Sequence, residues 1–157
     1  MAEEPIPQTL LVIGGSSLVG HRLREIAENF PGAVQFTGRS RLSPGDLVLD
    51  ARAPERFSTN EKITAVIVCA PIRLVSDALL RRLYDLGMRR LVVFSSTSIL
   101  TKVQTTDAAE RDMLAQLQNS EALVKRFCEH ASVRWTILRP TMIYDEGRDQ
   151  NVTQIMR

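Results

Sequence analysis

The sequence predicts a single doubly wound α/β domain over residues 1–157, with about six parallel strands in the order 3-2-1-4-5-6 and helices on both faces. Two observations carry this prediction. Short continuous apolar runs alternate with amphipathic helical stretches along the chain, and a glycine-rich turn follows the first run. Parallel strands joined by helices require right-handed crossovers. The length agrees, because 157 residues are enough to bury a core within one domain.

Apolar runs are interpreted as strands, and they cover residues 9–13, 34–37, 47–49, 65–70, 91–94 and 135–138. The first run is too short for a helix and stops at Gly14, so we expect a strand that is buried on both faces. Helical spacing of apolar residues predicts helices over residues 17–29, 74–86 and 107–130. Residues 51–64 have no clear period and are interpreted as a short helix or a loop.

The composition excludes several classes of protein. Lys and Arg number 20 against 18 Asp and Glu, so the charges nearly cancel and no nucleic-acid partner is expected. No apolar stretch reaches the roughly 18 residues of a membrane span, and residues 1–5 carry no signal-peptide pattern, so no membrane partner is expected. Cys69 and Cys128 lie far apart and form no Cys-x-x-Cys pair, which speaks against a disulfide or a metal site and favours a cytoplasmic protein.

The glycine-rich turn, Gly-Gly-Ser-Ser-Leu-Val-Gly at residues 14–20, joins the first predicted strand to the first predicted helix. Glycines let the backbone turn tightly and approach a diphosphate, while the helix that follows presents free N–H groups and the positive end of its dipole. The turn therefore predicts a dinucleotide site. The alternative is a tight turn that binds nothing. A Walker-type phosphate loop is excluded, because no Gly-Lys-Ser/Thr follows.

Residues 12–23, VIGGSSLVGHRL, resemble the nucleotide loop of the extended short-chain dehydrogenase/reductases, a superfamily that includes the NAD-dependent epimerase/dehydratases. The Gly-x-x-Gly-x-x-Gly loop of that family is matched by Gly14 and Gly20, whereas Ser17 replaces the middle glycine. Residues 65–71, 92–99 and 135–147 resemble the family's fourth strand, its fifth strand with a serine turn, and its sixth strand with an Arg-Pro loop.

The resemblance spans nearly the whole chain and implies an NAD(P)-binding Rossmann fold. It also implies which residues hold the dinucleotide. They are Gly14, Gly15, Ser16, Ser17, Leu18, Val19, Gly20, Arg39, Ser40, Asp50, Ala51, Ala70, Pro71, Ser95 and Pro140.

The end of the second predicted strand indicates which dinucleotide is preferred. A free ribose 2′-hydroxyl is usually held there by a carboxylate, but this sequence has Thr-Gly-Arg-Ser at residues 37–40. Arg39 would pair with a 2′-phosphate, which favours NADP(H) and leaves NAD(H) as the alternative. An ordinary solvated arginine is the other interpretation of Arg39.

Asp50 matches the family residue that meets the adenine amino group, or else it is a helix N-cap or turn residue.

The hydride chemistry of the family uses a Ser or Thr together with a Tyr-x-x-x-Lys pair on the long helix. Ser96 aligns with the Ser/Thr, and its neighbour Thr97 would substitute for it; otherwise these hydroxyls satisfy backbone groups at the strand end. Met113 and Leu117 fill the tyrosine and lysine positions, and we expect both in the apolar core stripe of the helix. Since a methionine cannot transfer a proton in place of a phenol, the sequence speaks against Tyr-dependent catalysis.

Four further expectations concern the long helix, the end of the chain and its assembly. Glu121 and Lys125 are expected to form a solvated i, i+4 ion pair. Family position implies that Tyr144, Arg148 and Asn151 face a substrate. Family members continue well past residue 157, so we expect a fragment, an isolated nucleotide-binding domain or a truncated natural protein, in which the substrate-binding region is absent or is supplied by another chain. Apolar surface left by an incomplete sheet would then favour a homodimer.

The sequence leaves three functions open. An atypical NAD(P)-dependent oxidoreductase or nucleotide-sugar epimerase/dehydratase is the family's commonest type of activity. A non-catalytic dinucleotide-binding protein would serve as a redox sensor or an accessory subunit, and the missing Tyr and Lys favour it. An interaction domain that binds no nucleotide is the third, based on Ser17 in place of a loop glycine.

Overall fold

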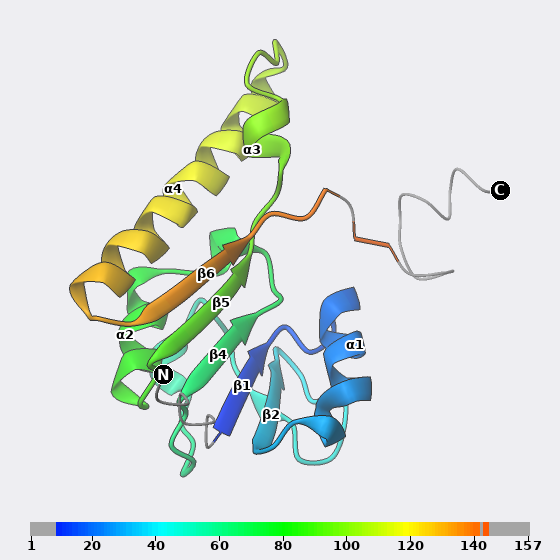
Figure 1. Cartoon of the computed structure of the whole chain (residues 1–157), viewed down its shortest axis with the longest axis vertical. Coiled ribbons are helices and arrows are strands. Elements are labelled where there is room, and N and C mark those ends of the chain that lie inside the picture. Colours follow the sequence, from blue (N-terminus) through cyan, green and yellow to red (C-terminus); the bar gives the residue numbers. More distant parts are fainter. Residues whose placement is uncertain (1–8, 142, 145–157) are drawn as a thin grey trace, which may run out of the picture.

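The computed structural model describes residues 9–141, 143 and 144, which contain one six-stranded sheet (Figure 1). Its strands are β1 (Thr9–Ile13), β2 (Ala33–Gly38), β3 (Leu47–Val48), β4 (Ala65–Val68), β5 (Arg90–Phe94) and β6 (Arg134–Leu138). Every pair of neighbouring strands is parallel, and the order is β3-β2-β1-β4-β5-β6. The predicted fold class and strand order are confirmed.

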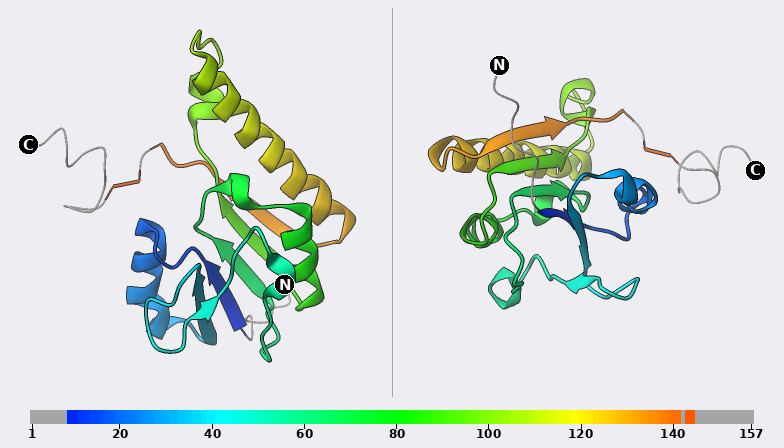
Figure 2. Two further views of the ribbon diagram at one scale, coloured as in Figure 1. Left: turned by 180° about the vertical axis from the view of Figure 1, so that it is seen from behind. Right: turned by 60° about the horizontal axis from the view of Figure 1, so that its bottom comes forward.

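Helices cover both faces of the sheet (Figure 2). α1 (Leu18–Ile26) packs on one face, and α2 (Asp77–Asp85) and α4 (Ala108–His130) pack on the other. The short helix α3 (Ser98–Thr101) lies between β5 and α4, and 3-10 turns occupy Ala27–Asn29, Pro54–Arg56 and Ile72–Leu74. None of the helices in the described part of the chain has the length and hydropathy of a membrane span.

The central strand β1 divides the core into two clusters. Leu11 and Ile13 point into the larger cluster beneath α2 and α4, whereas Leu10 and Val12 point into the smaller one beneath α1. All five residues of β1 are buried, as predicted for a strand covered on both faces. The carboxyl end of β1 therefore leaves the sheet at the centre of its edge, where a doubly wound fold places its ligand site.

Several helix boundaries differ from the predicted ones because capping side chains fix them. The helix predicted from residue 74 begins at Asp77, since the Ser76 hydroxyl caps it by accepting a hydrogen bond from the Leu79 amide at 3.1 Å. The apolar residues before Ser76 belong to a 3-10 turn instead. Residues 51–64 form a loop around one 3-10 turn, Pro54–Arg56.

The apolar stripe of α4 is shorter than predicted. Leu114, Val124 and Cys128 are buried, and Leu117 packs against the core, but the Met113 side chain is 44% exposed. In Figure 1 the first turns of α4 extend past the end of β6, so only the later part of the helix lies over the sheet. The expectation that Met113 belongs to the core is wrong, because Met113 lies outside the buried stripe that its neighbour Leu114 joins.

A buried ion pair ties the loop between β2 and β3 to α1. Arg24 Nη1 and Nη2 donate to the two Asp46 oxygens at 2.8 and 3.0 Å, and the guanidinium lies 4.1 Å from the centroid of the Phe36 ring. Asp46 also accepts from the amides of Leu42 and Ser43 at 3.0 and 3.1 Å. Burial by itself raises the pKa of the Asp46 carboxyl, but the hydrogen bonds from Arg24 and the two amides outweigh it and hold the pKa below its usual 3.8.

We expect Asp46→Asn to lower the free energy of unfolding by about 2 kcal/mol at neutral pH, because Arg24 loses its counter-charge; a fully buried pair would cost about 3–5 kcal/mol. The Asp46 pKa is depressed in the folded state. Its contribution is therefore complete above about pH 4 and is lost as the pH falls through the folded pKa. Urea unfolding between pH 7 and pH 2 measures the effect, and the wild-type and variant stabilities should converge in acid.

The matched control is Asp77→Asn, which breaks an exposed pair with Arg81 and should change stability little. A loss from Asp46→Asn that stays constant down to pH 2 would contradict the assigned role of the carboxylate.

Candidate nucleotide-binding site

The glycine-rich turn after β1 forms the first wall of the site. The amides of Gly14 and Gly15 donate to the Thr37 carbonyl on β2 at 3.1 and 2.9 Å. Ser17 is the N-cap of α1, because its hydroxyl accepts from the Gly20 amide at 3.0 Å and donates to the Gly14 carbonyl at 2.8 Å. The side chain that replaces the family's middle glycine therefore holds the turn closed. Helix geometry leaves the other first amides of α1 without intrahelical partners, as an anion site requires.

Gly14 and Gly20 let three backbone segments meet at this turn. A Cβ atom at Gly20 would lie 2.3 Å from the Gly14 carbonyl oxygen, and one at Gly14 would lie 2.6 Å from the Ala70 amide nitrogen. Gly14 also has a φ of +89°, in the left-handed region that glycine adopts without strain. No side chain fits at either position, so β1, α1 and the chain after β4 contact one another through bare backbone.

A cavity of about 340 Å³ opens beside this turn, at the carboxyl ends of β1, β2, β3 and β4. Its lining brings together many of the predicted cofactor-binding residues, namely Gly14, Ser16, Ser17, Arg39, Asp50, Ala51, Ala70 and Pro71. Of the others, Gly15 and Gly20 are buried under the turn, Leu18 and Val19 are half-buried in the first turn of α1, and Ser40 is exposed.

Sequence reasoning missed two arginines of the lining, Arg52 and Arg73. Both follow the carboxyl end of a predicted strand, as Arg39 does, and this position in the sequence is the signal that could have identified them. None of the three guanidinium groups has a hydrogen-bond or ion-pair partner among the described residues. Asp50 is the carboxylate of the lining, and its Oδ1 accepts from the Arg52 amide at 3.0 Å. That bond makes Asp50 a turn residue, and its contact with adenine stays a prediction.

Cys69 follows β4 and lies half-buried beside the turn. Burial raises the pKa of its thiol to about 12, although a hydrogen bond with the Ser17 side chain offsets part of the shift. The buried Cys128 has its pKa raised to about 11, also by burial. Both cysteines are free thiols, and both stay protonated at neutral pH, so neither is activated as a nucleophile.

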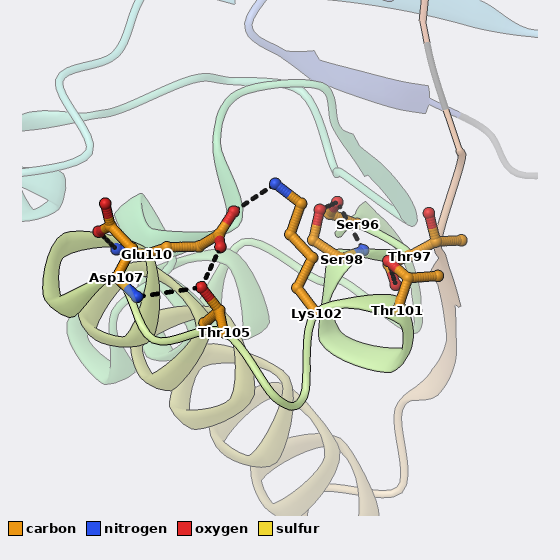
Figure 3. Close-up of polar contacts among 8 residues, drawn as sticks. All are labelled: Ser96, Thr97, Ser98, Thr101, Lys102, Thr105, Asp107 and Glu110. Carbon is orange, nitrogen blue, oxygen red and sulfur yellow. Dashed lines mark hydrogen bonds and ion pairs between the residues drawn. The ribbon is translucent and has the colours of Figure 1, made fainter.

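The serine turn after β5 does not line the cavity. Ser96 Oγ accepts from the Ser98 amide at 3.1 Å and donates to Ser98 Oγ at 2.9 Å (Figure 3). The Thr97 amide and hydroxyl both donate to the Pro140 carbonyl at 3.3 Å. Ser96 thus satisfies groups of the turn itself and Thr97 satisfies a backbone carbonyl after β6, in line with the structural interpretation. Catalysis by Ser96 or Thr97, and cofactor contacts of Ser95 and Pro140, stay predictions.

Lys102 and Thr105 close the segment between α3 and α4, and both bond the Glu110 carboxylate (Figure 3). Asp107 caps α4, because its Oδ1 accepts from the Glu110 amide at 2.9 Å. In a capping box the Glu110 carboxylate would return to the Asp107 amide, but that amide donates to Thr105 Oγ1 at 3.3 Å. The Lys102 hydrogen bond lowers the pKa of Glu110, so the pair is a charged bridge near neutral pH.

The expected solvated pair between Glu121 and Lys125 is wrong. Glu121 is buried, and its carboxylate binds Arg139, which follows β6, with Nε to Oε1 at 2.9 Å and Nη2 to Oε2 at 2.5 Å. The Nζ atom of Lys125 instead lies 4.0 Å from Oε1 of Glu129. The Arg139 guanidinium holds the pKa of Glu121 below its usual range despite burial. Helical spacing reveals partners within α4 only, whereas the fold supplies a stronger one from the neighbouring strand.

The predicted substrate residues lie away from the cavity lining or beyond the described part of the chain. Tyr144 is 67% exposed and does not line the cavity. Arg148 and Asn151 lie outside the described residues. A substrate role for these three residues stays a prediction.

No protein-family model matches the chain, and no curated protein matches it in sequence. Solved structures match it in fold. UDP-glucose 4-epimerase from Thermotoga maritima with UDP-glucose is 16% identical at a TM-score of 0.62, over 83% of this chain and 54% of that one. A short-chain dehydrogenase/reductase superfamily protein from Agrobacterium tumefaciens with bound NAD is 18% identical at a TM-score of 0.61, over 83% of this chain and 48% of that one. A GDP-L-fucose synthetase from Naegleria fowleri bound to NADP is 20% identical at a TM-score of 0.66, over 96% of this chain and 56% of that one.

The chain has the fold of the short-chain dehydrogenase/reductases. The resemblance drawn from the glycine turn and the serine turn is thereby confirmed at the level of the fold, together with the predicted Rossmann architecture. The chain spans about half the length of these solved structures. Function therefore has to be argued from the residues that line its own cavity.

We expect Gly20→Ala to lower the free energy of unfolding by about 2–3 kcal/mol, because the added methyl group forces the turn away from α1. The control is Gly45→Ala, where φ is +90° and no atom lies within 4 Å of the new Cβ. Left-handed strain alone should cost that variant about 1 kcal/mol. Urea unfolding of both variants measures the difference, and equal losses would contradict the close contact at Gly20.

Proposed function

We propose that this chain binds a nicotinamide dinucleotide, NADP(H) in preference to NAD(H), across the carboxyl ends of β1, β2, β3 and β4. The cavity of about 340 Å³ carries the proposal, since it joins the glycine turn to Arg39. The diphosphate would lie over residues 14–17 and meet the first amides of α1. The 2′-phosphate would pair with Arg39 through charge-assisted hydrogen bonds.

The residues present fit such a ligand. Gly14 and Gly20 leave bare backbone where a diphosphate has to approach closely, and the Ser17 hydroxyl keeps the turn in shape. No carboxylate follows β2, where NAD-specific proteins place one for the ribose 2′-hydroxyl. Solved structures of this fold that hold NAD and NADP support the class of ligand.

A bound nicotinamide would supply or accept a hydride, but the chain's own residues favour a non-catalytic role. Met113 occupies the position of the family's tyrosine, is exposed, and has no ionisable group to hold a proton. The Ser96 hydroxyl is bonded within the serine turn, and the Thr97 hydroxyl donates to the Pro140 carbonyl. We therefore propose a dinucleotide-binding sensor or accessory subunit. The alternative is an atypical oxidoreductase or nucleotide-sugar epimerase/dehydratase, which the named activities of the solved structures favour.

Compartment and assembly are further parts of the proposal. Two free thiols support a reducing compartment, so we place the protein in the cytoplasm.

A homodimer is supported by three exposed apolar side chains near α3 and the start of α4. They are Leu100, Val103 and Met113, exposed by 61%, 73% and 44%.

We expect Arg39→Glu to weaken NADPH binding about 10- to 100-fold, because the 2′-phosphate loses a charge-assisted partner worth roughly 1.5–3 kcal/mol and meets a like charge. NADH affinity should hold or rise, since the new carboxylate suits a ribose hydroxyl. Calorimetric titration with each dinucleotide measures the ratio. Arg56→Glu is the control, because Arg56 is exposed and outside the cavity. An unchanged ratio of NADPH to NADH affinity in Arg39→Glu would overturn the assignment of Arg39.

A further inference from the structure

Three arginines converge on the cavity from three different strand ends. Arg39 follows β2, and Arg52 lies close to it in the fold, because β3 pairs with β2 and the Leu49 amide donates to the Gly38 carbonyl at 2.9 Å. Arg73 approaches from the opposite side, in the 3-10 turn that follows β4. Arginine residues therefore line the cavity on two sides.

These arginines differ from those that hold the fold together. Arg24 and Arg139 are each bound to a buried carboxylate, Asp46 and Glu121. Among the described residues, the guanidinium groups of the cavity lining have no such partner. With three arginines against Asp50, the lining carries a formal charge of +3 − 1 = +2 before the glycine turn is counted. Like charges that share a cavity repel one another, and an anionic ligand would relieve that repulsion.

The three arginines of the lining lie outside the glycine turn, where the diphosphate is expected. The glycine turn and the α1 N-terminus already suit the diphosphate, so the arginines of both walls are available for an additional phosphate on the adenosine ribose. The hydroxyls of Ser96 and Thr97, which are expected at the nicotinamide end, are bonded locally. Ser96 is bonded to Ser98, Thr97 to Pro140, and none of these residues lines the cavity. Recognition is therefore concentrated on the adenylate half of the ligand.

We propose that the chain recognises the 2′-phosphorylated adenylate half through Arg39, Arg52 and Arg73 together and does not distinguish NADP⁺ from NADPH. Arg52 and Arg73 are thus specificity-determining residues alongside Arg39. This inference rests on the proposed function and specifies which property of the dinucleotide pool the protein responds to. A protein of this kind responds to the total amount of phosphorylated dinucleotide, and not to the ratio of its oxidised and reduced forms.

The first experiment is calorimetric titration of the chain with four ligands: NADPH, NADP⁺, 2′-phospho-ADP-ribose, which is NADP⁺ without its nicotinamide, and ADP-ribose. The first three should bind with affinities within about threefold of one another. ADP-ribose should bind at least tenfold more weakly, because the arginines lose their phosphate partner. Binding of NADPH with a more than tenfold loss for NADP⁺ or 2′-phospho-ADP-ribose would overturn this inference and leave the proposed function standing. If NADPH itself failed to bind, the proposed function would fall as well.

The second experiment tests Arg52 and Arg73 individually. Arg52→Ala and Arg73→Ala should each weaken 2′-phospho-ADP-ribose binding about 3- to 10-fold and reduce its dependence on salt. The control Arg56→Ala removes an exposed arginine that does not line the cavity and should leave every affinity unchanged. Thermal unfolding checks that each variant is folded. Folded Arg52→Ala and Arg73→Ala variants with wild-type affinity for 2′-phospho-ADP-ribose would limit phosphate recognition to Arg39 and overturn the shared role.

Discussion

The close contact of bare backbone at Gly14 and Gly20 is the constraint on which the site depends. At this point β1 ends, α1 begins and the chain after β4 passes, with room for no Cβ atom at either glycine. The contact fixes the direction in which α1 leaves the sheet and therefore where its first amides point. The Ser17 hydroxyl then bonds both the Gly14 carbonyl and the Gly20 amide, which keeps the turn in one shape. A serine at this position is thus compatible with a phosphate-binding turn, because its side chain is consumed in capping α1.

Two ion pairs, each with a buried carboxylate, hold the segments around this contact. Arg24 and Asp46 anchor the loop between β2 and β3, from which Arg39 projects, and Arg139 and Glu121 join the end of β6 to α4. In each pair the hydrogen bonds overcome the cost of burial and lower the pKa of the carboxyl. These arginines serve the fold because carboxylates satisfy them. The arginines of the cavity lack such partners among the described residues, which makes their charge available to a ligand.

The two halves of the expected active site, one for binding the adenylate and one for catalysis, differ in which of their expected groups this chain retains. The half expected to hold the adenylate retains a glycine turn, an open cavity and three arginines that have no partner within the described part of the chain. In the other half, the resemblance predicts a tyrosine at the position of Met113, and the hydroxyls of Ser96 and Thr97 bond to Ser98 and to the Pro140 carbonyl. Binding and proton transfer need different groups, so the first can persist without the second. This separation is the physical basis for proposing a dinucleotide-binding role without family-type catalysis.

The sequence by itself determined the fold class, the strand order and the glycine turn, because apolar periodicity and turn chemistry are local properties of the chain. Only the tertiary structure decided which residues became partners. Glu121 binds Arg139 from another element instead of Lys125 on its own helix, and Met113 is exposed although its neighbour Leu114 is buried. Arg52 and Arg73 likewise join Arg39 only once parallel strands bring their carboxyl ends to one edge. Such groupings depend on contacts between distant segments, and no local pattern in a single sequence records them.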